Sequence, residues 1–228
     1  MIRSSLVCIA IFVAMLCGCA TPTPMAFEKE NDKLSEQSPP VLLMTATIRN
    51  TYRTSFQPKV IVLHVEKPDA KDKADRLNFK MDDKSKMETG SPVEGNTYLM
   101  RLPLEKGTYH IKGMSSHAAS FPINGFYFAP LHSSVQVSEP GVFYLGHVEA
   151  TIRERQGSEF KAGPSVPLID QAIAGASGGT FDIEISDRLA KDEAMFKTRF
   201  PALQNVDIKK AILPPFDRQA AQKWWEQN

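Results

Sequence analysis

The sequence has little cysteine, and it has none beyond residue 19. Its three cysteines are Cys8, Cys17 and Cys19, so no disulfide can form within residues 20–228. The fold of that part of the chain must therefore come from a hydrophobic core rather than from covalent cross-links. A chain of this length is long enough to supply such a core.

The chain also lacks an excess of charge of either sign. It has 27 basic and 26 acidic residues, and the first 18 residues contain a single charged side chain, Arg3. Without that segment the basic and acidic counts are equal. Proteins that bind nucleic acid usually carry a basic surface, so we expect no nucleic-acid partner.

The apolar run near the N-terminus is too short to cross a membrane. It extends from Leu6 to Leu16, which is 11 residues, whereas a membrane-spanning helix needs about 20. The run follows Arg3 and leads into small residues, the pattern of a secretory signal peptide. We therefore expect residues 1–18 to be removed on export.

The residues that end this run carry a resemblance. Leu16-Cys17-Gly18-Cys19 resembles the lipobox of bacterial lipoproteins, although Cys17 is unusual at its position. The resemblance implies cleavage before Cys19, a diacylglyceryl group on its sulfur and a further acyl chain, such as palmitate, on its amino group. Ala20 is similar to the residue that sorts lipoproteins to the outer membrane, here expected on its periplasmic face. An ordinary cleaved signal peptide is the alternative.

The rest of the chain divides by composition and periodicity. Residues 19–40 are rich in proline and polar residues, which favours a lipidated, flexible tether. Beyond them, Phe181, Ile183 and Ile185 illustrate an alternation with polar residues that is typical of half-buried strands. About nine short strands are expected, within residues 41–48, 60–65, 77–81, 97–102, 108–114, 126–129, 135–137, 142–153 and 181–185.

Short strands separated by turns favour an antiparallel β-sandwich over a parallel sheet with crossover helices. We therefore predict a mainly β domain over residues 41–186, with a Gly- and Pro-rich insertion at 156–179. Residues 187–228 are predicted to be a helical C-terminal extension. The helical spacing of Leu189, Glu193 and Phe196 predicts its first helix, and Asp217 is expected to cap its last.

Two further segments resemble a known kind of domain. Leu102-Pro-Leu-Glu-Lys-Gly-Thr-Tyr109 and Pro140-Gly-Val-Phe-Tyr-Leu-Gly146 are similar to segments of prealbumin-like or carboxypeptidase-regulatory-like β-sandwich modules, which occur in uncharacterised bacterial lipoproteins. The resemblance covers roughly residues 41–186. It implies a binding or scaffolding unit without catalytic residues or a cofactor.

One motif suggests an enzyme. Gly175-Ala-Ser177-Gly-Gly179 matches the G-x-S-x-G pattern of serine hydrolases. That pattern requires a strand before the serine and a helix after it, whereas here a strand is predicted to follow Ser177. No histidine lies beyond His147, although the hydrolase order places one there. A hydrolase that uses Ser177 is therefore an alternative hypothesis.

The five histidines have no spacing that would place two of them together on one local face, so no metal site is predicted. Both His110 and His147 lie in predicted strands, and a metal-binding lipoprotein that uses strand histidines is a second alternative.

The residues that we favour for function lie at the C-terminus. Trp224 and Trp225 are the only tryptophans of the chain, and tryptophan is enriched at the centres of protein interfaces. Successive helical residues differ by about 100° in direction, so one tryptophan is expected to dock and the other to be at least partly exposed. Our main hypothesis is a non-enzymatic envelope lipoprotein that binds another protein or a cell-wall or glycan partner through these residues.

Overall fold

The computed structural model describes residues 22–227, except residues 36, 88–92 and 165–171. The predicted signal peptide and Cys19 lie outside the described residues. The described chain is mainly β, as predicted, and contains two α-helices. In chain order its elements are β1 (Pro22–Thr23), β2 (Val41–Asn50), β3 (Lys59–Glu66), η1 (Lys73–Asp75), β4 (Arg76–Lys80), β5 (Asn96–Pro103), β6 (Gly107–Ser120), β7 (Ile123–Val137), β8 (Val142–Glu154), β9 (Gly179–Ser186), α2 (Leu189–Arg199), η2 (Pro201–Leu203), β10 (Ile208–Lys210) and α3 (Arg218–Gln227).

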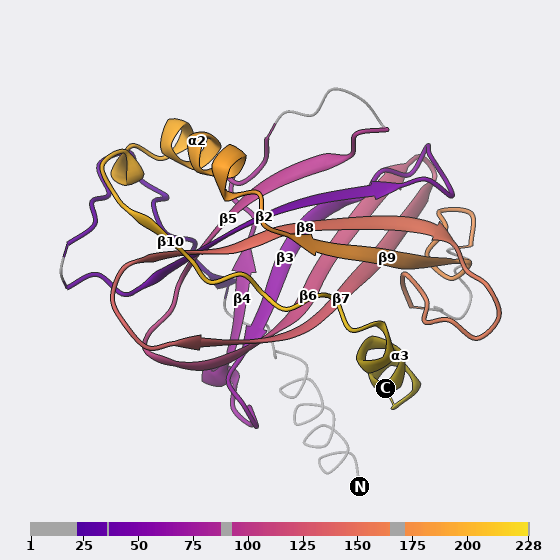
Figure 1. The fold of residues 1–228 in the computed structure, drawn as a ribbon. Coiled ribbons are helices and arrows are strands. Elements are labelled where there is room, and N and C mark those ends of the chain that lie inside the picture. The colour runs from indigo at the N-terminus through magenta and orange to yellow at the C-terminus, as the bar shows by residue number, and fades with distance from the viewer. Residues whose placement is uncertain (1–21, 36, 88–92, 165–171, 228) are drawn as a thin grey trace, which may run out of the picture.

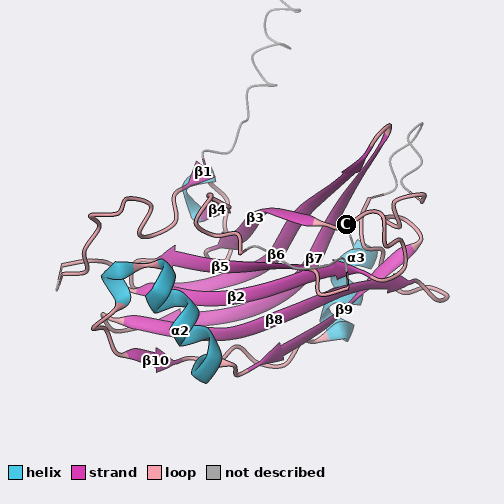
Figure 2. Ribbon diagram, turned by 90° about the horizontal axis from the view of Figure 1, so that it is seen from above, coloured by secondary structure: helices cyan, strands magenta, loops and turns pink. Residues whose placement is uncertain are grey.

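The strands form two five-stranded sheets (Figure 1). The strand order of the first sheet is β1-β4-β3-β6-β7. In the second sheet the order is β10-β8-β2-β5, and β9 also pairs with β8. The long β6–β7 hairpin extends beyond the rest of its sheet (Figure 2), and Phe121 at its turn is fully exposed.

Both sheets are mixed, so the predicted antiparallel arrangement is wrong for the fold as a whole. β1 pairs in parallel with β4, and β8 pairs in parallel with both β2 and β10. The turn after β7 brings the chain back to the end at which β2 starts, where the Val41 N–H donates to the Gly141 carbonyl. β8 therefore begins beside the start of β2. Alternating hydrophobicity indicates a strand, but it does not show from which end that strand enters its sheet.

The main hydrophobic core lies between the two sheets. It joins Leu42 and Met44 of β2 to Leu63 of β3 and Ile111 of β6, and all four side chains are buried. A second cluster lies on the outer face of the second sheet, under α2, and contains Leu43 of β2. The first half of β2 is therefore buried on both faces, which accounts for its unbroken apolar run from Val41 to Met44 rather than an alternating one.

Residues 22–27 differ from the flexible tether predicted for residues 19–40. β1 pairs with β4, and the side chains of Met25 and Phe27 are buried. The Ala26 N–H donates to the Arg101 carbonyl over 3.0 Å, and the Phe27 ring lies 6.3 Å from that of Phe200. The two buried side chains, the pairing of β1 and the backbone bond of Ala26 together hold this segment on the domain.

The predicted strands correspond to β2–β9, with one difference. The two short strands expected at 126–129 and 135–137 form a single strand, β7. Residues 155–178 connect β8 to β9, and they include all of the insertion predicted from composition except Gly179, which begins β9.

The C-terminal extension contains two α-helices as expected, together with the short strand β10 in the segment that sequence left open between strand and helix. Asp217 caps α3, since its carboxylate accepts the Ala220 N–H over 2.9 Å. The helix α2 covers the outer face of the second sheet (Figures 1 and 2). Neither helix of the described residues has the length and apolar content that crossing a membrane requires.

Candidate ligand-binding pocket

Residues 160–164 connect the edges of the two sheets. The Phe128 N–H of β7 donates to the Ala162 carbonyl over 2.8 Å, and the Ala162 N–H donates to the Gly179 carbonyl of β9 over 2.7 Å. Gly163 passes so close to β7 that a Cβ atom there would lie 2.0 Å from the Phe126 carbonyl oxygen. The segment is therefore held as a fixed wall between the edge strands.

The helix α3 is fastened to this wall by polar side chains in its first half. The Arg218 guanidinium donates to the Phe181 carbonyl over 2.7 Å and to the Glu159 carboxylate over 2.8 Å. Gln222 accepts the Phe160 N–H over 2.6 Å and donates to the Ser158 carbonyl over 2.8 Å. These bonds fix the direction in which the second half of α3 points.

Glu159 is the centre of this attachment. Arg153 and Arg218 both form ion pairs with its carboxylate, at 2.6 and 2.8 Å. Hydrogen bonding from the Arg153 guanidinium holds the pKa of Glu159 well below its usual range. The carboxylate is therefore charged at neutral pH and is engaged by two guanidinium groups of its own chain.

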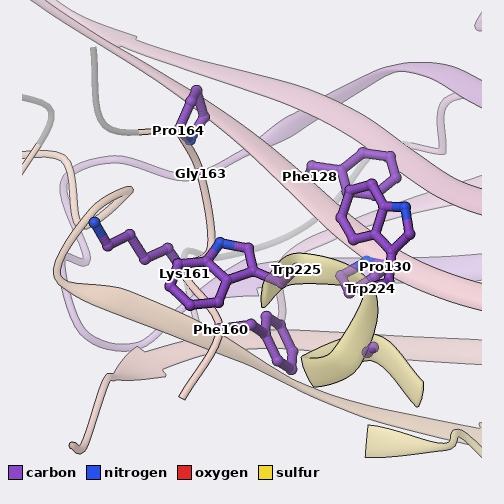
Figure 3. Close-up of a pocket in the computed structure, with 9 residues that line it drawn as sticks. Phe128, Pro130, Phe160, Lys161, Gly163, Pro164, Trp224 and Trp225 are labelled. Atoms are coloured by element: carbon purple, nitrogen blue, oxygen red, sulfur yellow. The ribbon is translucent and has the colours of Figure 1, made fainter. Parts of the chain in front are cut away.

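A pocket of about 450 Å³ lies between the second half of α3, β7 and the wall. Its size is within the range of small-molecule sites. Figure 3 shows its lining, and we call this site the α3 pocket. It is lined by Phe128, Pro130, Phe160, Lys161, Gly163, Pro164, Ala221, Trp224 and Trp225.

Trp224 forms one side of the pocket. Its ring lies 5.4 Å from that of Phe128 and 4.9 Å from that of His132, distances at which aromatic rings attract one another. Burial, and after it the charge of Lys112, lower the pKa of His132 to about 4. Trp224 is therefore packed against a neutral imidazole at neutral pH.

Trp225 forms the opposite side, together with Phe160 and Lys161 (Figure 3). The Lys161 amine lies 6.0 Å from the centre of its indole ring, and the Arg155 guanidinium lies 5.7 Å from it. Both tryptophans are half-buried. The expectation was one docked side chain and one at least partly exposed; Trp224 is docked on β7, Trp225 is partly exposed, and the pocket lies between the two indoles.

Comparisons with protein-family models, curated proteins and solved structures find no match. The chemistry of the pocket must therefore be read from its lining. Lys161 is the only ionisable side chain among the nine lining residues, so the lining has no nucleophile paired with a base, which covalent or acid–base catalysis would need. An apolar pocket with one cation is suited to binding.

Ser177 lies in the turn that precedes β9 and is half-buried. Within the described residues no hydrogen bond joins its hydroxyl to a histidine or a carboxylate. A strand follows it rather than a helix, as the sequence predicted. The last glycine of the motif has a packing role, because a Cβ at Gly179 would lie 2.4 Å from the Gly175 carbonyl oxygen.

The strand histidines do not come together. His110 lies in β6 of the first sheet, where its ring bonds to the Ser134 hydroxyl, and His147 is buried in β8 of the second sheet. In the described part of the chain, no group of three or more histidine, cysteine, aspartate or glutamate side chains is placed to hold a metal ion.

A buried polar cluster under α2 was not predicted. The Asp192 carboxylate accepts hydrogen bonds from the hydroxyls of Thr45 and Tyr144, both at 2.5 Å. His147 Nδ1 lies 2.8 Å from the same Thr45 oxygen. The helical face predicted to contain Glu193 instead buries Asp192. Since all four residues are buried, the cluster holds α2 on the second sheet and offers no surface to a ligand.

Of the α3-pocket residues, sequence singled out Trp224 and Trp225 but missed Phe160, Lys161 and Gly163. These three lie in the predicted insertion, which has no periodicity from which their direction could be inferred. An aromatic and a basic residue within a Gly- and Pro-rich segment were the available signal.

Proposed function

We propose that this protein is an outer-membrane lipoprotein, anchored by lipid on Cys19 and facing the periplasm, that acts as a non-enzymatic binding module. The lipobox-like residues before Cys19 support the anchor. Pro22 of β1 follows Cys19 by three positions, a span of at most about 10 Å. The domain would then lie close to the membrane surface rather than at the end of a long tether.

The α3 pocket is the proposed binding site. The observation that carries this proposal is the pairing of the only two tryptophans of the chain on opposite sides of one pocket. Aromatic side chains bury a large area when they contact a ligand, and here polar bonds elsewhere on α3 hold them in place. The site therefore needs little ordering on binding, which favours affinity.

We further propose that the two sheets are a variant of the prealbumin-like or carboxypeptidase-regulatory-like β-sandwich. The residues that carry that resemblance have structural roles. Tyr109 and Tyr144 are buried, and Gly141 and Gly146 adopt positive φ angles of 132° and 112°. The mixed strand directions depart from a purely antiparallel sandwich, so an experimental structure of the domain is the test.

The anchor is tested by Cys19→Ser in the full chain. The substitution should abolish incorporation of labelled palmitate and release the protein from the membrane fraction. Normal labelling and unchanged membrane retention of the variant would contradict the anchor.

The pocket is tested in intact cells with a photoreactive residue at position 164, since Pro164 is exposed and lines the α3 pocket. Irradiation should attach an envelope component that mass spectrometry can detect, whether it is a protein, a glycan or a lipid. The same residue at position 61 is the control, because Ile61 lies on β3 and is 39% exposed. Equal capture at both positions, or none at position 164, would contradict a binding role of the pocket.

A further inference from the structure

We propose that the tip of the β6–β7 hairpin, with Phe121 at its turn, inserts shallowly into the membrane that holds the lipid anchor. The hairpin would then set the orientation of the domain on that membrane. This inference rests on the proposed function, because it needs Cys19 to hold the chain at a lipid surface. It depends on three observations: the unsupported end of the hairpin, the absence of charge along it and its position relative to β1.

The end of the hairpin has no support from the rest of its sheet. The pairing of β3 with β6 ends at Lys59 and His117, whereas β6 and β7 continue to pair as far as Ser120 and Ile123. Beyond His117 these two strands pair only with each other in the described part of the chain. A two-stranded ribbon of this kind is at best marginally stable in water, so a contact at its end would stabilise it.

The hairpin is also free of charge and apolar at its end. Residues 113–138 contain no aspartate, glutamate, lysine or arginine, in a chain of which 23% of the residues are charged. Phe121 is fully exposed, and Phe126 on β7 is 50% exposed. Ile173 is 53% exposed beside the same strand, to which the next residue is bonded through its carbonyl. Three of the five large hydrophobic side chains that are exposed among the described residues therefore lie at this end, which marks it as an interaction surface.

This chemistry favours a lipid surface over a protein. Charged side chains are costly in the hydrocarbon region, and aromatic side chains are enriched at the boundary between membrane and water. A protein interface, by contrast, has a polar rim that remains accessible to solvent. The backbone groups of the turn need hydrogen-bond partners, which hydrocarbon cannot supply. Insertion is therefore limited to the Phe121 side chain and its apolar neighbours at the level of the lipid headgroups.

The tip lies where it can reach the membrane. Pro22 of β1 follows Cys19 by three positions and lies level with Gly113 of β6, three strand spacings across the sheet. Phe121 lies about eight residues farther along β6, so strand geometry places it about 30 Å from Pro22. Figure 2 shows β1 and the tip of the hairpin along the same edge of the molecule. A membrane that holds the chain through Cys19 can therefore meet Phe121 as well.

The test uses the lipidated mature protein in vesicles of phosphatidylethanolamine and phosphatidylglycerol that contain no other protein. The chain has no cysteine beyond Cys19, whose sulfur carries the lipid, so Ser120→Cys provides one thiol for a fluorescent dye. Lipids with brominated acyl chains should quench this dye. Ala194→Cys is the matched control position, because Ala194 is exposed on α2, which Figure 2 shows on the side of the molecule away from the tip. Its dye should not be quenched.

Two variants of the protein labelled at position 120 assign the effect to the exposed ring. Phe121→Ser should shift the equilibrium about tenfold from the inserted to the free hairpin, and folding should be unaffected because the ring is fully exposed. Val93→Ser is the control, since Val93 is 78% exposed but lies outside the hairpin, and its quenching should match that of the parent. Because the hairpin has no charged side chains, quenching in vesicles of phosphatidylcholine alone should be the same and should not depend on salt.

No quenching at position 120, equal quenching at positions 120 and 194, or no effect of Phe121→Ser would overturn the insertion. A dye at position 120 that is exposed in lipid vesicles but shielded in intact cells would overturn it in favour of a protein partner. None of these results would affect the anchor, which palmitate labelling of Cys19 tests separately. Failure of that labelling would instead show that the proposed function is wrong, and this inference with it.

Discussion

Acidification should destabilise this protein between pH 6.5 and pH 4 through the buried histidine His147. The Thr45 hydroxyl donates its hydrogen to Asp192, so His147 Nδ1 must carry the proton that Thr45 accepts. His147 Nε2 is buried and has no hydrogen-bond partner among the described residues. Protonation would place an unpaired N–H and a positive charge in the domain interior.

The size of the effect follows from the pKa. Burial lowers the pKa of His147 to about 4 from 6.5, with the charge of Arg188 acting in the same direction and those of Asp192 and Glu149 opposing it. Because the unfolded chain binds the proton more readily, stability is unaffected above pH 6.5 and falls as pH drops toward 4. At pH 5 the free energy of unfolding should be about 2 kcal/mol lower than at pH 7 from this residue alone. His132, whose pKa is also lowered to about 4, should add a smaller loss because it is only half-buried.

Urea denaturation of the mature chain with Cys19→Ala, followed by circular dichroism at pH 7 and pH 5, measures this loss. The variant His147→Gln should be less stable at pH 7 but should lose about 2 kcal/mol less than its parent on going to pH 5. Glu159 and Asp187, whose pKa values are lowered by ion pairing, contribute only below their unfolded values near pH 4. The same pH dependence in variant and parent would refute the reasoning.

Two further substitutions test the packing, again by urea denaturation. Arg101→Met should lower the free energy of unfolding by about 3 kcal/mol or more, because this fully buried guanidinium is the partner of a carboxylate and of backbone carbonyls. Its control, Arg49→Met, breaks a partly exposed ion pair and should lower the free energy of unfolding by at most about 1 kcal/mol. Gly163→Ala should lower the free energy of unfolding by about 1–3 kcal/mol through its clash with β7 and should shift the tryptophan emission. Its control, Gly178→Ala, should do neither, because a Cβ there would meet nothing closer than 3.3 Å. Equal losses of stability within the arginine pair or within the glycine pair would contradict the packing described here.

The strands were predictable because local patterns specify them, whereas the partner of each strand depends on the path of the chain. Phe181, Ile183 and Ile185 alternate with polar residues along β9, so their strand could be recognised without its neighbours. The parallel pairing of β2 with β8 depends on the path of the chain between them, which places β3, β4, β6 and β7 in the other sheet before β8 returns beside β2. No pattern within β2 or β8 contains that information.

Buried charges were the least predictable part of the fold. Arg101 is fully buried in β5, where its guanidinium binds the Ala26 carbonyl and lies 4.3 Å from the ring centre of Phe200. A charged residue inside the apolar run that begins at Tyr98 was the available signal. Its partners are Asp82 before β5, Ala26 in the segment assigned to a tether and Phe200 just after α2, so only the tertiary structure could reveal them.

The candidate site was predictable only in part, for a similar reason. Trp224 and Trp225 attract attention because they are adjacent and near the C-terminus, but their importance lies in what faces them. Phe128 comes from β7 and Phe160 from the insertion, and the two backbone bonds of Ala162 bring these segments together. Those bonds involve main-chain groups, which every residue has, so no side-chain pattern could have predicted them.

The two C-terminal helices are held in different ways, and this difference favours α3 as the functional one. The helix α2 buries Leu189, Asp192 and Phe196 against the second sheet, so its removal would expose a hydrophobic cluster and leave polar groups of β2 and β8 unpaired. In α3, by contrast, only Ala221 is fully buried. A helix of ten residues is marginal by itself, and the polar bonds of α3 lie in its first half. The second half carries both tryptophans, which are half-buried and line the α3 pocket, and Trp225 also packs against the main core. A helix that served only to complete the core would bury those indoles, which are the largest apolar surfaces it has. Their position on opposite sides of the α3 pocket is the feature on which the proposed binding role rests.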